Sequence, residues 1–175
     1  MSTYVFLDQS KTNIKELEQR LENIKKKFEL HKQGINLLPL DDADEAMKKV
    51  EEIRLKFEED KYEIEILIQD INKEISEQNS EKKKGYFKIF SNLGMMGLNA
   101  ALAKTTQNTK EYGLSAIFNG LSVATDVTAI VQIRKNIDEL NKLLERAKEE
   151  EKKIVEAINE LNEKYKNYQL KVTPT

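Results

Sequence analysis

The chain has 175 residues and a net charge of −2, and charged residues make up 34% of it with the two signs nearly balanced. Such a mixture is expected of solvated helix faces and argues against a nucleic-acid-binding surface. The absence of cysteine excludes disulfides, thiolate metal sites and thiol catalysis, and the length suits a single helical domain over residues 1–175.

The N-terminal sequence, MSTYVFLD, has neither the basic region nor the long apolar run of a secretory signal. We therefore expect a cytoplasmic protein or one secreted without a leader, with possible membrane association. Proline occurs only at Pro39 and Pro174, and glutamate, lysine, leucine and isoleucine are abundant. Because few helix breakers interrupt these strong helix formers, the sequence predicts an all-α fold.

The first helix is predicted over residues 10–34, with Ser10 or Thr12 as its N-terminal cap and Gly34 at its end. Its apolar residues recur at alternating spacings of three and four, which is a heptad pattern: Ile14, Leu17, Leu21, Ile24 and Phe28. The connector over residues 35–40 contains leucines that we expect to be tucked under neighbouring helices.

Two further heptad segments are predicted as the arms of a stem, over residues 42–84 and 134–170. Asp41, Asp42 and Asp44 are acidic residues of the kind that favours the start of a helix. The first arm places Val50, Ile53, Phe57, Ile64, Leu67 and Ile71 on its seam, and the second places Ile133, Ile137, Leu140, Leu144, Ala147, Ile154, Ile158, Leu161, Tyr165 and Tyr168 there.

A turn near residues 108–110 brings these two seams together along their length. It pairs Phe57 with Leu161 and Gln78 with Leu140, and it sets the polar seam residues Asp60 and Glu151 against apolar partners. The predicted fold is therefore an elongated antiparallel coiled-coil hairpin or bundle of three to four helices, with the first helix packed along the stem.

Between the arms lies a segment of different composition, residues 86–133, which we call the apolar hairpin. Only five of its 48 residues are charged. Gly94, Gly97 and Ala101 form one strip of small residues, and a second strip consists of Gly113, Ala116, Gly120 and Ala124. Small residues let helix backbones approach closely, so we expect the strips to face each other, with Gly94, Gly97, Gly113 and Gly120 at the closest points.

Three interpretations of the apolar hairpin remain open. It could be a tight helix pair shielded by the first helix or by another subunit. It could be a permanent membrane hairpin, since residues 86–103 and 112–133 are each about as long as a bilayer requires, although Asn92, Asn99, Asn119 and Asp126 are costly in hydrocarbon. It could also insert only on a trigger, from a form that otherwise hides it.

Basic residues flank the apolar hairpin and suit contact with lipid headgroups: Lys82, Lys83, Lys84, Arg134 and Lys135. The residues expected to meet a membrane or a helical partner are Tyr86, Phe87, Phe90, Gly94, Gly97, Ala101, Tyr112, Gly113, Phe118, Gly120 and Asp126. Asp126 is notable because a carboxylate buried in such a segment needs a partner or a raised pKa.

The run SNLGMMGLNAALA at residues 91–103, together with residues 113–133, resembles in layout the helical pore-forming toxins and, more loosely, apolipoprotein-L-like proteins. In those proteins amphipathic coiled-coil helices flank an apolar hairpin with small residues. The resemblance implies a lipid bilayer as the target, oligomeric assembly and no cofactor.

Catalytic and metal-binding patterns are not found in the sequence. His31 is the only histidine, and a lone histidine near a helix end is typical of a solvated or capping residue. We therefore expect neither an enzyme nor a cofactor, metal, nucleic-acid or small-molecule site. The function predicted first is a membrane-active helical protein that acts as a homo-oligomer, and the alternative is a soluble coiled-coil scaffold or adaptor that binds a helical protein partner or itself.

Overall fold

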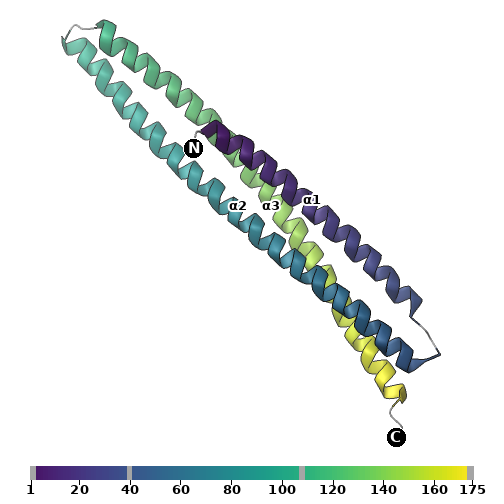
Figure 1. The fold of residues 1–175 in the computed structure, drawn as a ribbon. Helices are drawn as coiled ribbons and strands as arrows, with labels where there is room; N and C mark the ends of the chain where they lie inside the picture. The colour runs from purple at the N-terminus through teal and green to yellow at the C-terminus, as the bar shows by residue number, and fades with distance from the viewer. Residues whose placement is uncertain (1–2, 39–40, 107–108, 173–175) are drawn as a thin grey trace. The chain divides into compact units, whose positions relative to one another are not determined.

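The computed structural model describes residues 3–38, 41–106 and 109–172, and it describes their side chains except at residues 3, 99–115 and 117–119. The described residues form three α-helices and one short 3₁₀ helix, in the order α1 (Thr3–Gln33), η1 (Gly34–Leu37), α2 (Ala43–Thr106) and α3 (Thr109–Val172) (Figure 1). No strand occurs among these residues, so the prediction of an all-α fold is confirmed.

The ends of the helices agree with the sequence at some points and differ at others. α1 ends just before Gly34, as predicted, but it begins at Thr3. Ser10 is therefore not a cap: it lies inside the helix, is buried, and donates a hydrogen bond of 2.8 Å to the carbonyl of Phe6. Leu37 is 75% exposed, so the expectation that the connector leucines are covered is wrong at this residue.

The start of α2 follows the acidic signal in the sequence. Asp42 accepts a hydrogen bond of 3.0 Å from the backbone N–H of Glu45, which is the geometry of an N-terminal cap. α2 then continues without interruption through Gly85 to Thr106, so residue 85 is not a helix boundary. α2 ends at Thr106 and α3 begins at Thr109, and residues 107–108 between them, next to the predicted turn, lie outside the described residues.

Contacts divide the chain into two compact units. Unit 1 consists of Met1–Ile14 and Lys73–Asn141, and unit 2 consists of Lys15–Asn72 and Lys142–Thr175. Each unit contains parts of all three helices. Its core contains the apolar seam residues that the heptads predict, and these are buried except for Ile137, Tyr165 and Tyr168. The core also contains residues that the predicted seams leave out, among them Ile130 and Leu143. Tyr165 is exposed, so its place in the predicted seam is wrong.

In unit 1 a layer of buried polar side chains joins the three helices. Gln78 on α2 donates hydrogen bonds to Ser10 on α1 (2.6 Å) and to Glu74 (2.9 Å), and it accepts one from Asn136 on α3 (3.4 Å). Asn13 on α1 donates to Glu74 at 3.0 Å. Polar groups can be buried at little net cost when they are hydrogen-bonded in this way, and the pairing favours one register of the helices.

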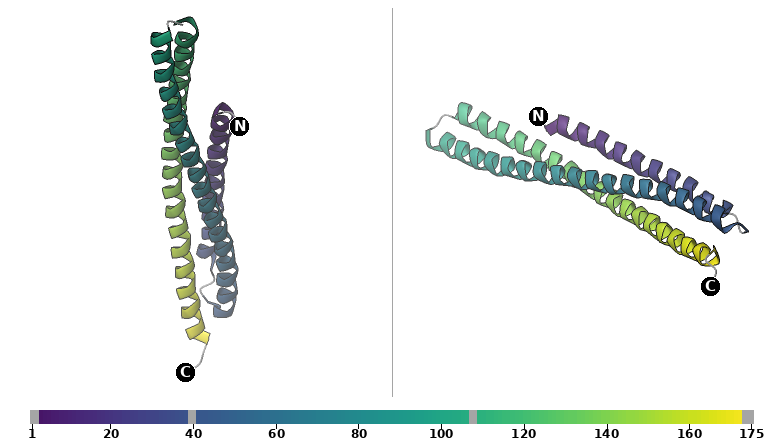
Figure 2. Two further views of the ribbon diagram at one scale, coloured as in Figure 1. Left: turned by 90° about the vertical axis from the view of Figure 1, so that its left-hand side faces the viewer. Right: turned by 60° about the horizontal axis from the view of Figure 1, so that its bottom comes forward.

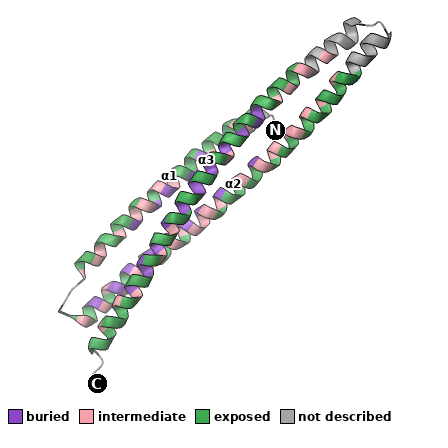
Figure 3. Ribbon diagram, turned by 180° about the vertical axis from the view of Figure 1, so that it is seen from behind, coloured by how far each residue is buried: buried purple, intermediate pink, exposed green. Residues whose placement is uncertain are grey.

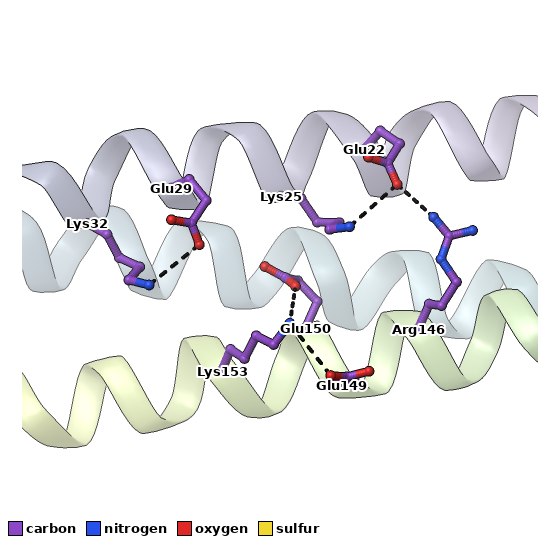
Figure 4. Close-up of polar contacts among 8 residues, drawn as sticks. All are labelled: Glu22, Lys25, Glu29, Lys32, Arg146, Glu149, Glu150 and Lys153. Carbon is purple, nitrogen blue, oxygen red and sulfur yellow. Dashed lines mark hydrogen bonds and ion pairs between the residues drawn. The ribbon is translucent and has the colours of Figure 1, made fainter.

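In unit 2 ion pairs link the helices at the margins of the core. Arg20 on α1 lies 2.7 Å from Asp70 on α2, and Glu22 on α1 accepts a hydrogen bond of 2.7 Å from Arg146 on α3, as Figure 4 shows. These pairs are half-exposed, so each contributes little to stability.

The polar seam residue of α3 differs from the prediction. Glu150 is the residue buried in unit 2, where it pairs with Lys153 at 3.5 Å, whereas Glu151 is only half-buried (Figure 4). The seam takes a step of three residues after Ala147 instead of four, which moves the polar position from Glu151 to Glu150.

Candidate functional site

The apolar hairpin belongs entirely to unit 1, where α2 and α3 lie side by side (Figures 1 and 2). Asn92 on α2 donates hydrogen bonds to Ser122 (3.1 Å) and Asp126 (3.4 Å) on α3, and Tyr86 accepts one from Arg134. Residue numbers rise along α2 as they fall along α3, so the two segments are antiparallel. Asp126 is half-buried, and the hydrogen bond from Asn92 supplies the partner that a carboxylate needs in an apolar segment.

No described side chain within residues 86–128 is buried. Figure 3 shows the same region without the buried colour that marks the core of the unit. Large apolar side chains are instead exposed on both helices: Phe87, Phe90, Leu93, Met95 and Leu98 on α2, and Leu121, Val127 and Val131 on α3. Two helices can bury only the faces that they turn toward each other, so the remaining apolar surface stays open.

On α2 the exposed surface includes a stripe formed by Phe87, Phe90, Gly94 and Gly97, which recur three or four residues apart. Phe87 is 76% exposed and Phe90 is 74% exposed. The residues of α2 that are half-buried against α3, among them Ile89 and Asn92, lie on a different face. The stripe therefore points away from the helix interface.

On α3 a second stripe is formed by Leu121, Ala124, Val127 and Val131, all of which are exposed. Ser122 and Thr125 lie on another face, together with the polar layer around Asn136. The apolar hairpin thus carries one exposed and mainly apolar stripe on each helix, and the exposed Thr128 lies within the stripe of α3.

Within the described residues, a β-carbon at Gly94 or Gly97 would meet no atom within 4 Å, so the expectation that these glycines allow a close helix approach is wrong there. At Gly120 the nearest atom would be the sulfur of Met96, at an ordinary contact distance of 3.6 Å. The close approach occurs at Gly85, where a β-carbon would lie 3.0 Å from Cγ1 of Ile130. The sequence contains Gly85 but gives no spacing signal that separates it from the other glycines.

Four of the predicted contact residues, Ala101, Tyr112, Gly113 and Phe118, have side chains outside the described part of the structure. The five predicted headgroup residues are in the described part. Lys83, Lys84, Arg134 and Lys135 are exposed and Lys82 is half-buried. All of them lie at the end of the apolar hairpin that adjoins the rest of unit 1.

A polar pair in unit 2 was not expected from the sequence. Nδ1 of His31 on α1 lies 2.6 Å from Oδ2 of Asp60 on α2, and Asp60 is fully buried. His31 is therefore neither solvated nor a cap, and Asp60 is paired with α1. Burial raises the pKa of the Asp60 carboxyl, while the hydrogen bond and charge of His31 oppose this rise. The second carboxyl oxygen of Asp60, Oδ1, is buried and has no hydrogen-bond partner among the described residues.

Within the part of the chain that the structure describes, no helix has an apolar stretch long enough to cross a bilayer. Comparison of the chain with protein-family models, with curated proteins and with solved structures finds no match. The case for a function therefore rests on the residues and contacts of this chain.

Proposed function

We propose that this chain is a membrane-active helical protein whose apolar hairpin, residues 86–133, engages the surface of a lipid bilayer. The observation that carries the proposal is the pair of exposed apolar stripes, on a hairpin whose described side chains from residue 86 to residue 128 are never buried. Apolar surface of this extent is costly in water, and contact with lipid removes that cost.

Surface engagement fits the composition of the apolar hairpin better than a permanent span does. A helix that lies in the interface needs one apolar face and tolerates polar groups on the others. Asn92 on α2 donates hydrogen bonds to Ser122 and Asp126 on α3, so the polarity of these three side chains is partly compensated when the stripes enter lipid.

The stem supports this function as a frame for the apolar hairpin. We propose that the heptad seams of α2 and α3 continue the antiparallel pairing as a coiled-coil stem, along which α1 packs. Homo-oligomers assembled through the hairpins would give the layout of the helical pore-forming toxins or apolipoprotein-L-like proteins, which the sequence resembles. The proposed role involves no catalysis and no cofactor, and its setting is the cytoplasm or the outside of a cell that secretes the chain without a leader.

Flotation with liposomes tests the proposal, with dye release from the same vesicles as a second readout. We expect the full chain to float, and the double substitution Phe87→Ser and Phe90→Ser to stay in the dense fraction. The matched control is Leu30→Ser with Tyr62→Ser, which removes two large and well-exposed apolar side chains from unit 2. If the chain does not float at any pH or lipid composition, the proposed function is wrong.

A second candidate function is a soluble coiled-coil scaffold whose apolar stripes contact a helical protein partner or another copy. The exposed apolar stripes favour it, because a stripe of this kind can pack on another helix as well as on lipid. Sedimentation in the absence of lipid separates the two candidates. The scaffold is supported if the chain assembles through the stripes and if added vesicles do not disrupt the assembly.

A further inference from the structure

The charges of the chain are segregated, although its overall net charge is only −2. Residues 82–135 contain eight basic and two acidic residues, which is a net charge of +6. The remainder of the chain therefore carries −8. A positive potential of this kind around an apolar surface attracts an anionic partner even though the protein as a whole is acidic.

The described basic residues of this region gather at the base of the apolar hairpin. We call them the basic cluster, and they are Lys82, Lys83, Lys84, Lys88, Arg134 and Lys135. Lys84 pairs with Glu81 at 2.5 Å, and Arg134 donates a hydrogen bond to the hydroxyl of Tyr86. Lys82, Lys83, Lys88 and Lys135 have no acidic partner among the described residues. Their charges are therefore available to a ligand.

The basic cluster continues the two apolar stripes. Lys83 precedes Phe87 by four residues, which places it on the stripe of α2, and Arg134 and Lys135 follow Val131 by three and four residues, which places them beside the stripe of α3. Lysine and arginine at the end of an apolar stripe can reach headgroups while the apolar side chains enter the acyl region.

We propose that the basic cluster makes the apolar hairpin selective for bilayers that contain anionic phospholipids. The inference rests on the proposed function, since it names the kind of bilayer that the same surface engages. Nucleic acid is the other large polyanion that a basic surface could attract. It fits less well, because Leu121, Val127 and Val131 are aliphatic and would neither stack on bases nor leave water.

The test compares vesicles of phosphatidylcholine alone with vesicles in which part of the lipid is phosphatidylserine. The variant replaces Lys82, Lys83 and Lys135 by Gln. Its matched control replaces Lys26, Lys48 and Lys142 by Gln, so the two variants have the same net charge. These three lysines are exposed and have no acidic partner among the described residues.

We expect the natural chain to bind the anionic vesicles more tightly and to lose this preference as salt is raised. Each lysine near an anionic surface contributes about fivefold to binding, so the cluster variant should bind anionic vesicles roughly 100-fold more weakly. The control variant should bind them as the natural chain does. Binding of the cluster variant to neutral vesicles should be unchanged.

Equal binding of the natural chain to both kinds of vesicle would overturn this inference and leave the proposed function intact. Failure to bind either kind would overturn both. A parallel titration with transfer RNA covers the alternative partner: RNA binding that depends on the same three lysines, without vesicle binding, would assign the basic cluster to nucleic acid.

Discussion

The pair of His31 and Asp60 is the most constrained polar contact in unit 2, because a fully buried carboxylate depends on it. Removal of one partner of a buried pair leaves an uncompensated charge, at a typical cost of 3–5 kcal/mol. Since the side chain of His31 keeps some contact with solvent, we expect His31→Leu to lower the free energy of unfolding by about 3 kcal/mol. Urea denaturation at neutral pH measures this change.

The double variant His31→Leu with Asp60→Leu is the control for that prediction. Two apolar side chains replace the pair, so no charge is left buried, and we expect stability within about 1 kcal/mol of the natural chain. A double variant as unstable as His31→Leu alone would mean that the packing of His31, and not its charge, stabilises α1 against α2.

The stability of unit 2 should also depend on pH through Asp60. Burial raises the pKa of this carboxyl above its ordinary value of 3.8, so the folded chain holds the proton more strongly than the unfolded chain. The stabilisation from that proton is complete below pH 3.8 and is lost as the pH rises through the folded pKa. The free energy of unfolding should therefore fall across this window.

Comparison with Asp60→Asn isolates this contribution, because all other titrating groups are common to both chains. We expect the difference in unfolding free energy between the two proteins to change with pH in the window above pH 3.8 and to level off above it. Parallel stability curves over the whole range would show that Asp60 titrates alike in the folded and unfolded states.

At the scale of the elements, α2 and α3 approach each other closely at Gly85, where a β-carbon would lie 3.0 Å from Cγ1 of Ile130. Gly85→Leu must push Ile130 aside, and overpacking of this kind costs about 1–3 kcal/mol. Gly94→Leu is the matched control, since its side chain enters open space and a leucine favours helix more than glycine does. Thermal unfolding should show a lower midpoint for the first variant only, and equal midpoints would contradict the close packing at Gly85.

Heptad spacing predicted the helices well, because it reports the one property that most constrains a long helix, its buried face. The apolar seam residues of α1, from Ile14 to Phe28, and of α2, from Val50 to Ile71, are buried as the pattern requires. The start of α1 was missed because Ser10, a good capping residue, is used as a buried partner of Gln78. The local preference of serine favours the N-terminus of a helix, whereas tertiary packing places Ser10 inside α1.

The candidate site was predictable in composition but not in geometry. The low charge of residues 86–133 identified the segment, and Phe87 and Phe90 are exposed on it. Small-residue spacing could not show which face turns toward the other helix, so Gly94 and Gly97 were placed in the interface. The contact of His31 with Asp60 joins residues 29 apart, and no local pattern encodes such a pairing.

For the molecule as a whole, the separation of the stabilising core from the proposed functional surface has a direct consequence. Phe87 and Phe90 bury little, so their replacement by Ser should leave the unfolding midpoint nearly unchanged and should reduce binding of an apolar-surface dye. Phe57→Ser, in the core of unit 2, should lower the stability by about 3–5 kcal/mol. A large loss of stability in the first variant would mean that its aromatic side chains hold the fold together.

The same separation explains how an acidic and strongly charged chain could carry a membrane-binding surface. Most of the charge and nearly all of the described buried apolar residues belong to the parts where three helices pack, and the hairpin exposes large apolar side chains. We therefore expect the solubility of the chain to depend on the charged helices outside residues 86–133, because the hairpin has few charges of its own.

A fluorescent probe at a single position can show whether the apolar stripes enter lipid. The chain has no cysteine, so Phe90→Cys and Tyr62→Cys can each be labelled with an environment-sensitive dye at one exposed site. On addition of vesicles we predict a blue shift and protection from an aqueous quencher at position 90, and no change at position 62. If the spectrum at position 90 does not change under conditions where the chain sediments with vesicles, the stripe of α2 does not enter lipid.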